Sequence, residues 1–357
     1  MSTSGADKAV ATVYSGGFRI AVPVVRLDNS RSVGPTPTAL PRPSPVVREC
    51  LQTARELLGR RGFQDMVSAT LAVRRALRID PRSVDSWILL AAISMLRVNR
   101  GQADSREIVL RRARRALRHA LAIAPDAGDA LAELGWITAA IDGQTTDGLV
   151  LLDRALALDD SNWFAHMCRA WALHAARRPE EGLAEFEAMM RCNPLSTFST
   201  GSYGYALGCS GRIREAFAVL DRGIRQMPMV DSLLSARSSV AAMAGDLDRA
   251  LVDARACAQL APDVPNQLYA LAYALAVRGE VDEAHKLFDR MTRARGWLAP
   301  SWLAILLAGL GERRAASDAL RRAASEGCTW LSFVQYDPRL RDIVPAEFAG
   351  LEHQAVR

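Results

Sequence analysis

Lysine is nearly absent from this chain: only Lys8 and Lys286 are lysines among its 45 basic residues. A phosphate-binding loop of the Gly-x-x-x-x-Gly-Lys type needs a lysine at its end, and neither lysine stands in such a motif. The Gly-x-Ser-x-Gly turn of many hydrolases has only incomplete matches, at residues 200–204 and 208–211. We therefore predict neither nucleotide hydrolysis nor a nucleophilic serine, and we expect a protein that is not an enzyme.

Metal-binding spacings are absent as well. The six cysteines are widely separated along the chain, so no Cys-x-x-Cys pair exists. The five histidines never form a pair four positions apart beside a glutamate, which is the spacing that directs two imidazoles to one zinc ion. His166 and His174 share one predicted helix and are interpreted as groove or surface histidines. The sequence predicts no metal site, no cofactor and free thiols in a reducing compartment.

Long hydrophobic runs are also lacking. No stretch approaches the roughly 20 apolar residues that a membrane-spanning helix needs. The segment 1–17 lacks the basic and then apolar pattern of a secretion signal. We therefore expect a cytoplasmic protein without a membrane span, and half of the 357 residues are apolar, enough to bury a sizeable core. The oligomeric state stays open.

The positive charge is concentrated in one part of the chain. The formal net charge is +6, and residues 55–118 hold 15 arginines against six acidic residues, a local charge of +9. The rest of the chain is therefore slightly acidic, and an anionic partner is expected to meet the N-terminal part.

The N-terminal segment, 1–45, differs from the rest. Residues 33–45 contain five prolines, a composition that favours extended and unpaired backbone. Before them, residues 18–27 form the one β-rich run, in which Pro23 restricts a strand to an edge or a bulge. We predict that residues 1–45 are a flexible arm and linker with one short strand.

From residue 46 onward the pattern is helical and repeats. Glycines at positions 211, 245 and 279 recur at equal intervals, and prolines at 194, 228 and 262 recur at the same interval. A glycine can end one helix in a left-handed turn, and a proline stops the next helix. Each period is therefore a pair of helices joined by a turn, with small residues where neighbouring helices approach closely.

These residues resemble the tetratricopeptide repeat family over roughly residues 60–325. Trp87, Leu90 and Ala91 match the large-Leu-Ala pattern of the first helix, and Leu131, Leu134 and Gly135 match it again. Phe186 and Phe288 occupy the aromatic position of the second helix. The resemblance implies an all-α, right-handed superhelical solenoid of antiparallel helix pairs. We expect seven to eight pairs over residues 46–327 and a cap and tail over 328–357, with an insertion near 97–106 in the second unit.

A second resemblance concerns the two ends of the chain. Residues 330–340, which include Tyr336-Asp337-Pro338-Arg339, are similar to the closing segment of repeat arrays in bacterial winged-helix regulators and adenylate-cyclase-like proteins. Residues 19–22 are similar to the first strand of the TolB-like segment that precedes such arrays. The chain has no room for a cyclase or a DNA-binding domain. This resemblance implies a regulatory or sensory module.

Aromatic residues recur at one position of the first helices, which in this family faces the concave groove. We predict a peptide groove formed by Trp136, Phe164, Met167, Trp171, Phe198, Tyr205, Asn266, Tyr269 and Tyr273, where Trp136 matches only if one inserted residue is allowed. In that case the rings are anchors with one polar tip each. In the alternative interpretation, the superhelix is tightly wound and the rings only pack between repeats. The Lys and Asn residues that grip acidic chaperone tails in some family members are not present.

A basic helix carries the second candidate surface. Arg111, Arg112, Arg114, Arg115 and Arg118 lie opposite the apolar face that Leu110, Ala113 and Leu117 form. Such a face is ordinarily solvated, and the aromatic residues typical of nucleic-acid readers are missing, so nucleic-acid binding is not favoured.

Two functions follow. The first is a scaffold without catalytic activity that binds a protein or peptide segment in the concave groove. The alternative is a regulatory module that acts through its arginine-rich repeats on nucleic acid or an acidic partner.

Overall fold

The computed structural model of the protein describes residues 10–15, 18–23, 43–60, 63–101, 105–194, 197–294 and 297–345. Within these ranges, the helices α1 to α16 follow one another as eight antiparallel pairs, and the two helices of each pair pack together. In chain order the pairs are α1 (Pro45–Arg60) and α2 (Phe63–Ile79), α3 (Val84–Asn99) and α4 (Arg106–Ile123), α5 (Gly128–Trp136) and α6 (Thr145–Leu158), α7 (Trp163–Ala175) and α8 (Pro179–Cys192), α9 (Thr197–Cys209) and α10 (Ile213–Gln226), α11 (Asp231–Met243) and α12 (Leu247–Leu260), α13 (Pro265–Val277) and α14 (Val281–Arg293), α15 (Pro300–Gly309) and α16 (Arg313–Ser325).

The turn inside each of the later pairs depends on one glycine. Gly211, Gly245, Gly279 and Gly311 have φ angles of 76°, 80°, 86° and 79°, in the left-handed region that glycine adopts without strain. The second helices α8, α10 and α12 end at Cys192, Gln226 and Leu260, each shortly before a proline. The regular interval between the glycines in the sequence is therefore the spacing of these turns, and the predicted helix pairs are confirmed.

The fourth pair breaks this rule. Arg177 stands one repeat interval before Gly211 and adopts the same left-handed conformation, with a φ angle of 61°. A residue with a Cβ atom is strained there by roughly 1–2 kcal/mol.

The third pair contains one inserted residue, which is needed to align Trp136 with the groove position of the other first helices. After Trp136, helix α5 continues as a π-helical turn, η1 (Ile137–Ile141), before α6 begins. A π-helical turn holds more residues than an α-helical one, so it absorbs an insertion without breaking the helix. Trp136 thereby keeps the groove-facing position.

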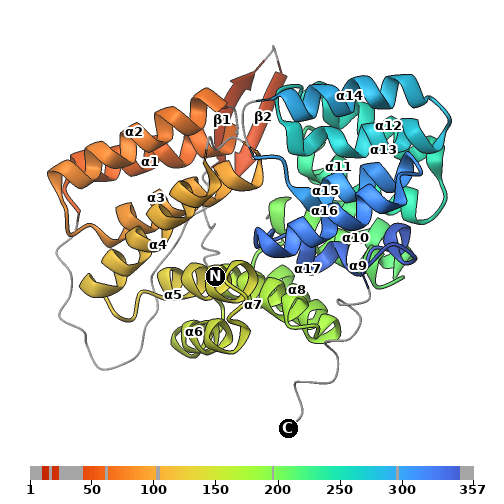
Figure 1. Ribbon diagram of the computed structural model, residues 1–357. Coiled ribbons are helices and arrows are strands. Elements are labelled where there is room, and N and C mark those ends of the chain that lie inside the picture. Colours follow the sequence, from red (N-terminus) through yellow and green to blue (C-terminus); the bar gives the residue numbers. More distant parts are fainter. Residues whose placement is uncertain are drawn as a thin grey trace, which may run out of the picture.

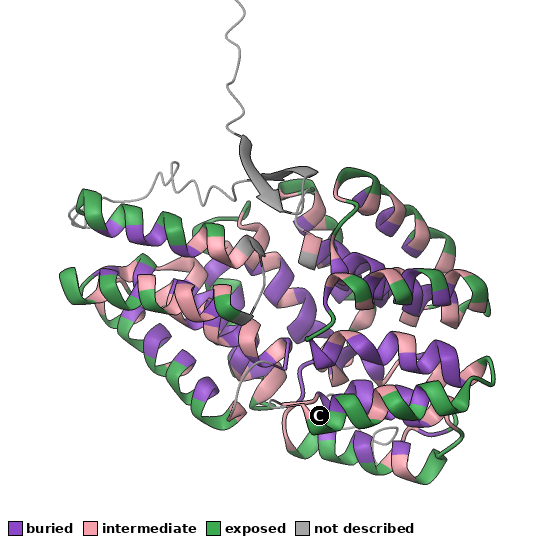
Figure 2. Ribbon diagram, turned by 90° about the horizontal axis from the view of Figure 1, so that it is seen from above, coloured by how far each residue is buried: buried purple, intermediate pink, exposed green. Residues whose placement is uncertain are grey.

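The pairs wind into a right-handed superhelix that closes on itself (Figure 1). At the end of α3, the guanidinium Nη1 of Arg100 lies 2.9 Å from Oδ2 of Asp231 on α11, and both side chains are buried. The side-chain amide of Asn266 on α13 donates to the carbonyl of Asn99 at 3.1 Å. The second pair therefore contacts the sixth and seventh, and buried residues gather along the inward-facing sides of the helices (Figure 2).

The C-terminal segment (residues 328–345) folds back into this interior. It contains the short helix α17 (Leu331–Val334) and the 3-10 turn η2 (Pro338–Leu340). Helix α17 contacts α7, α9, α15 and α16, and Phe333 and Leu340 are fully buried. The predicted cap thus includes a segment that lies inside the superhelix, while residues 346–357 of the predicted tail lie outside the described residues.

At the other end, strand β1 (Val10–Ser15) pairs antiparallel with β2 (Phe18–Pro23). Strand β2 falls in the run that predicts a strand, whereas the sequence gives no indication of β1. Most of the predicted proline-rich linker, up to residue 42, lies outside the described residues. In the part of the chain that the structure describes, no helix combines the length and apolar character needed to cross a membrane.

Candidate functional site

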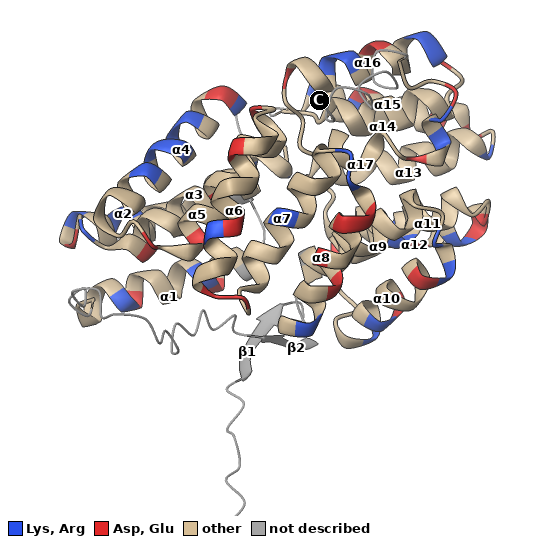
Figure 3. Cartoon of the chain, turned by 90° about the horizontal axis from the view of Figure 1, so that it is seen from below, with Lys and Arg blue, Asp and Glu red and all other residues tan. Residues whose placement is uncertain are grey.

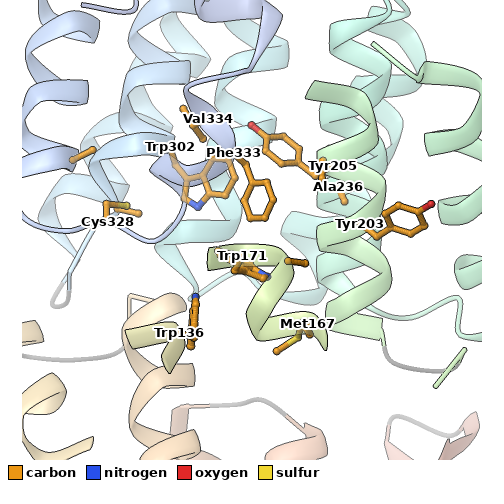
Figure 4. Close-up of a cluster of buried hydrophobic side chains, with 14 of the residues drawn as sticks. Trp136, Met167, Trp171, Tyr203, Tyr205, Ala236, Trp302, Cys328, Phe333 and Val334 are labelled. Carbon is orange, nitrogen blue, oxygen red and sulfur yellow. The ribbon is translucent and has the colours of Figure 1, made fainter. Parts of the chain in front are cut away.

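The predicted groove residues Trp136, Trp171, Tyr205, Tyr269 and Tyr273 line the inner wall of the superhelix, and we call this wall the interior groove. They come from four first helices, α5, α7, α9 and α13, and each is at most 9% exposed. Figure 4 shows Trp171 and Tyr205 beside Phe333 of the C-terminal segment, with Trp136 on the far side of Trp171. The repeat thus brings these rings together, and residues of the chain's own C-terminus cover them.

Aromatic contacts fix the C-terminal segment at the middle of the groove. The ring of Trp171 meets those of Phe333 and Trp330 edge to face, with centroids 4.6 and 4.9 Å apart. Trp136 approaches Trp171 in the same way at 5.7 Å. Edge-to-face pairs of this kind add to the hydrophobic contribution of burial, so the cluster is a strong attachment point for the segment.

A polar network holds the next part of the segment. The hydroxyl of Tyr205 donates to Oδ2 of Asp337 at 2.6 Å, and the guanidinium of Arg339 binds both oxygens of the same carboxylate. The guanidinium also lies over the ring of Tyr273, 4.7 Å from its centroid. Burial, followed by the negative charge of Asp337, raises the pKa of Tyr205, so this hydroxyl stays a hydrogen-bond donor.

Two further predicted residues organise the upper part of the groove. Tyr269 stacks on Trp302 with centroids 4.3 Å apart, and its hydroxyl bonds to Oγ of Ser239 at 2.9 Å. Asn266 accepts the backbone N–H of Ala299 at 3.0 Å in addition to its bond with Asn99. Both side chains are almost fully buried, so their polar atoms hold neighbouring elements in place.

The remaining predicted residues lie at the edge of this arrangement. Met167 is buried and its sulfur accepts the hydroxyl of Ser199 at 3.2 Å. Phe164 is partly exposed and packs against Trp163. Phe198 belongs to α9, but its side chain lies outside the described residues.

His174 contacts the C-terminal segment directly. Its ring lies 4.6 Å from that of Phe333, and its carbonyl accepts the side-chain amide of Gln335. Burial lowers the pKa of His174 to about 4, although the bond from Nδ1 to the carbonyl of Ala170 opposes this change. His174 is therefore neutral at neutral pH, and His166 lies elsewhere, bound to Glu185.

Glu133 on α5 is a second buried titratable group in the core. Its side chain is 2% exposed, and within the described residues its Oε2 atom has no hydrogen-bond partner. Burial, and then the charge of Asp129, raises the pKa of Glu133 to about 8. The described residues contain no cluster of three or more His, Cys, Asp or Glu side chains that could hold a metal ion, and so none at Glu133.

The predicted basic surface is on α4 and faces outward (Figure 3). Arg111, Arg112, Arg115 and Arg118 are exposed, whereas Arg114 is partly buried and forms an ion pair with Asp142. Arg111 lies 3.9 Å from Glu107 and Arg115 contacts His119. The helix therefore has the solvated arginine face that its sequence predicts.

Several residues of the interior are not among the predicted ones. Trp302, Trp330, Phe333, Asp337 and Arg339 complete the cluster. The motif of residues 330–340 was the available signal, but it indicates a closing segment and not where that segment lies.

No protein-family model and no curated protein matches this chain. Among solved structures, a monomeric IFIT1 variant with the capped RNA m7Gppp-AAAA is similar over 83% of this chain and 72% of its own, with a TM-score of 0.57 and 13% identity. A tetratricopeptide repeat protein from Parabacteroides merdae covers 73% of this chain and 97% of its own, with a TM-score of 0.46 and 17% identity. PilW, a type IV pilus biogenesis factor, covers 63% and 97%, with a TM-score of 0.43 and 20% identity. At these identities the likeness concerns the fold alone, a superhelix of antiparallel helix pairs.

Proposed function

We propose that this protein is a scaffold without catalytic activity that binds a segment of a partner protein in the interior groove. The observation that supports the proposal is the C-terminal segment itself. The groove holds it through pairs of specific side chains, Trp171 with Phe333 and Tyr205 with Asp337. Buried aromatic anchors with polar tips at the centre of a surface are typical of sites that dominate protein–protein binding.

The C-terminal segment would compete with the partner. It is tethered to α16, so its effective concentration at the groove is high. A partner segment binds only in the fraction of molecules whose groove is open, and its apparent affinity falls in proportion. The proposed partner segment therefore offers an aromatic side chain for Trp171 and a carboxylate for the Tyr205 hydroxyl.

A cytoplasmic location and the absence of a cofactor belong to the same proposal. All six cysteines are free, which supports a reducing compartment. The alternative function, regulation through the arginines of α4, has one supporting observation, the exposure of Arg111, Arg112, Arg115 and Arg118.

The experiment uses a fluorescent peptide with the sequence of residues 328–345 as the probe. Binding by fluorescence anisotropy is compared between the wild-type chain and a Phe333→Ala chain, whose own segment is weakened. We expect the variant to bind the peptide at least tenfold more tightly than the wild type. A peptide that carries the same Phe333→Ala change is the matched control and is expected to lose binding.

Circular dichroism is measured on both chains first, so that the comparison is made on folded protein. Equal and weak binding of both peptides by the folded variant would refute the proposal, because the groove would then not recognise a segment in trans.

A further inference from the structure

The insertion in the second unit leads to a small cavity in the interior. The sequence places this insertion near residues 97–106, and the structure shows where its beginning lies. Asn99 and Arg100, at the end of α3, reach across the superhelix to the first turns of α11 and α13. Next to these contacts is a cavity of about 60 Å³.

This cavity has a rim and a buried floor. Leu96, Ser232 and Gln267 are half-buried residues at its edge, whereas Arg100 and Ser202 are 6% and 2% exposed. Since one water molecule needs about 10–15 Å³ on the same measure, the cavity has room for a ligand of a few non-hydrogen atoms. Because Leu96, Ser232 and Gln267 are partly exposed, the cavity extends toward the surface on their side.

Two hydrogen-bond donors on the floor are unused. Nε of Arg100 and Oγ of Ser202 are buried and have no hydrogen-bond partner among the described residues. Two neighbouring polar groups are already engaged: Asp231 accepts from Arg100 Nη1 and from the backbone N–H of Ser232, and the hydroxyl of Tyr269 bonds to that of Ser239. Buried donors without partners destabilise a fold, so this pair is suited to an acceptor that comes from outside.

The electrostatic environment favours one negative charge. Helices α11 and α13 both begin at the cavity, and the positive ends of their dipoles face it. The charge of Arg100 is balanced by Asp231, which disfavours a ligand with two negative charges. The aromatic walls, Tyr269 stacked on Trp302, suit a short apolar group.

We propose that this cavity binds a small monocarboxylate. Its carboxylate accepts hydrogen bonds from Nε of Arg100 and Oγ of Ser202, and its short apolar part lies against Tyr269 and Trp302. This inference goes beyond the proposed scaffold function. The cavity shares Tyr205 and Trp330 with the interior groove, but its test acts on Arg100 and Ser202, which lie outside the C-terminal segment and are not changed in the peptide experiment.

The test titrates the full-length protein with acetate, propionate and butyrate, and follows tryptophan fluorescence and heat, because Trp302 and Trp330 line the cavity. For ligands of this size, dissociation constants down to about micromolar are attainable. We expect saturable binding below about 10 mM. If none of the three acids binds by that concentration, the cavity holds water only and the proposal is refuted; equal binding of propionamide would refute the carboxylate assignment.

The variant Ser202→Ala removes one donor and breaks no bond among the described residues. We expect its affinity for the best acid to fall about tenfold, as for loss of a hydrogen bond to a charged group, with an unchanged or higher melting temperature without ligand. The matched control is Ser238→Ala, since this buried hydroxyl donates to the carbonyl of Ala250 and does not line the cavity. Arg100→Lys keeps the charge beside Asp231 but loses Nε, and it is expected to bind weakly too. Wild-type affinity in both Ser202→Ala and Arg100→Lys would overturn the assignment.

Discussion

The interior groove and the outer face of α4 were both candidate sites, and they differ in almost every physical respect. In the groove, Trp171 and Phe333 are buried in an edge-to-face contact, and Asp337 is shared by Tyr205 and Arg339. On α4 most of the arginines are exposed: Arg111 and Arg115 contact residues of the same helix, and Arg114 forms an ion pair with Asp142 of the next unit. The chain thus has one surface held by contacts between residues more than 100 positions apart, and one whose contacts lie within a single helix or reach the next unit.

The difference shows that buried contacts can provide specific recognition, whereas exposed ion pairs contribute little. Exposed ion pairs contribute about 0–1 kcal/mol and are screened by salt, whereas truncation of a buried aromatic residue costs about 3–5 kcal/mol. A defined polypeptide segment is therefore held in the groove, and α4 offers charge without a defined geometry. The following changes separate the two regions further.

Phe333→Ala is expected to have the largest effect. The ring is fully buried between Trp171, His174 and Trp330, so its loss should lower the free energy of unfolding by about 3–5 kcal/mol, measured by urea denaturation. Val252→Ala, at a side chain that is 67% exposed, serves as the control, with a change of about 0.5 kcal/mol or less. A similar small change for Phe333→Ala would mean that the C-terminal segment does not lie in the groove.

Asp337→Asn compares a buried ion pair with a surface one. It leaves Arg339 buried without its counter-charge, and a loss of about 3 kcal/mol is expected. Asp142→Asn removes the partner of Arg114 on α4 and should cost about 1 kcal/mol or less, because both side chains are partly exposed. If urea denaturation gave the same loss of unfolding free energy for Asp337→Asn and Asp142→Asn, the buried and the surface ion pair would not differ as claimed.

Glu133→Gln tests how much the burial of a carboxyl group lowers the free energy of unfolding, and how that effect depends on pH. Burial raises the pKa of Glu133 to about 8, so the folded protein holds this proton between the ordinary pKa and 8, and the free energy of unfolding falls as the pH rises through that range. The variant should therefore be more stable than the wild type by roughly 4 kcal/mol at pH 9, and nearly equal to it at pH 5. A stability difference that does not change with pH would contradict the assigned burial.

Arg177→Gly is expected to have a smaller and stabilising effect. Glycine removes the strain of the left-handed conformation, and the free energy of unfolding should rise by about 1 kcal/mol. Gly211→Arg makes the reverse change at the equivalent turn and should cost a similar amount. If neither change altered the free energy of unfolding, the left-handed conformation assigned to Arg177 and Gly211 would be contradicted.

The arginines of α4 should matter least for stability. Arg112→Gln and Arg118→Gln are expected to change the free energy of unfolding by about 0.5 kcal/mol or less. If the helix binds a polyanion, the affinity of the wild type for heparin should fall steeply with salt. In the double variant, the slope of log K against log salt should be smaller in magnitude by about 2, roughly one for each arginine removed. Absent or salt-independent binding would leave α4 as a solvated face.

The fold was predictable from the sequence because its signals are local and periodic. Gly211, Gly245 and Gly279 mark the turns, and the helical register then places Trp171 and Tyr205 on the concave side. The one-residue insertion after Trp136 was also visible in the sequence, and the structure shows it as a π-helical turn, Ile137–Ile141. These inferences need only neighbours within one or two repeats.

The occupant of the groove was not predictable in the same way. The bond between Tyr205 and Asp337 joins residues 132 positions apart, and the pair of Arg100 and Asp231 joins residues 131 apart. Such contacts leave no periodic pattern. They depend on the accumulated rotation of several helix pairs, which a single sequence does not reveal.

The most direct test of the central claim is a double-mutant cycle between Tyr205→Phe and Asp337→Asn in the full-length protein. The claim is that the C-terminal segment lies in the interior groove in a defined register, with the Tyr205 hydroxyl on Asp337. Urea denaturation of the wild type, the two single variants and the double variant gives the coupling energy. We predict a coupling of about 1–3 kcal/mol, as for a buried hydrogen bond to a charged group. Additive effects, with a coupling within about 0.3 kcal/mol of zero, would contradict the claim.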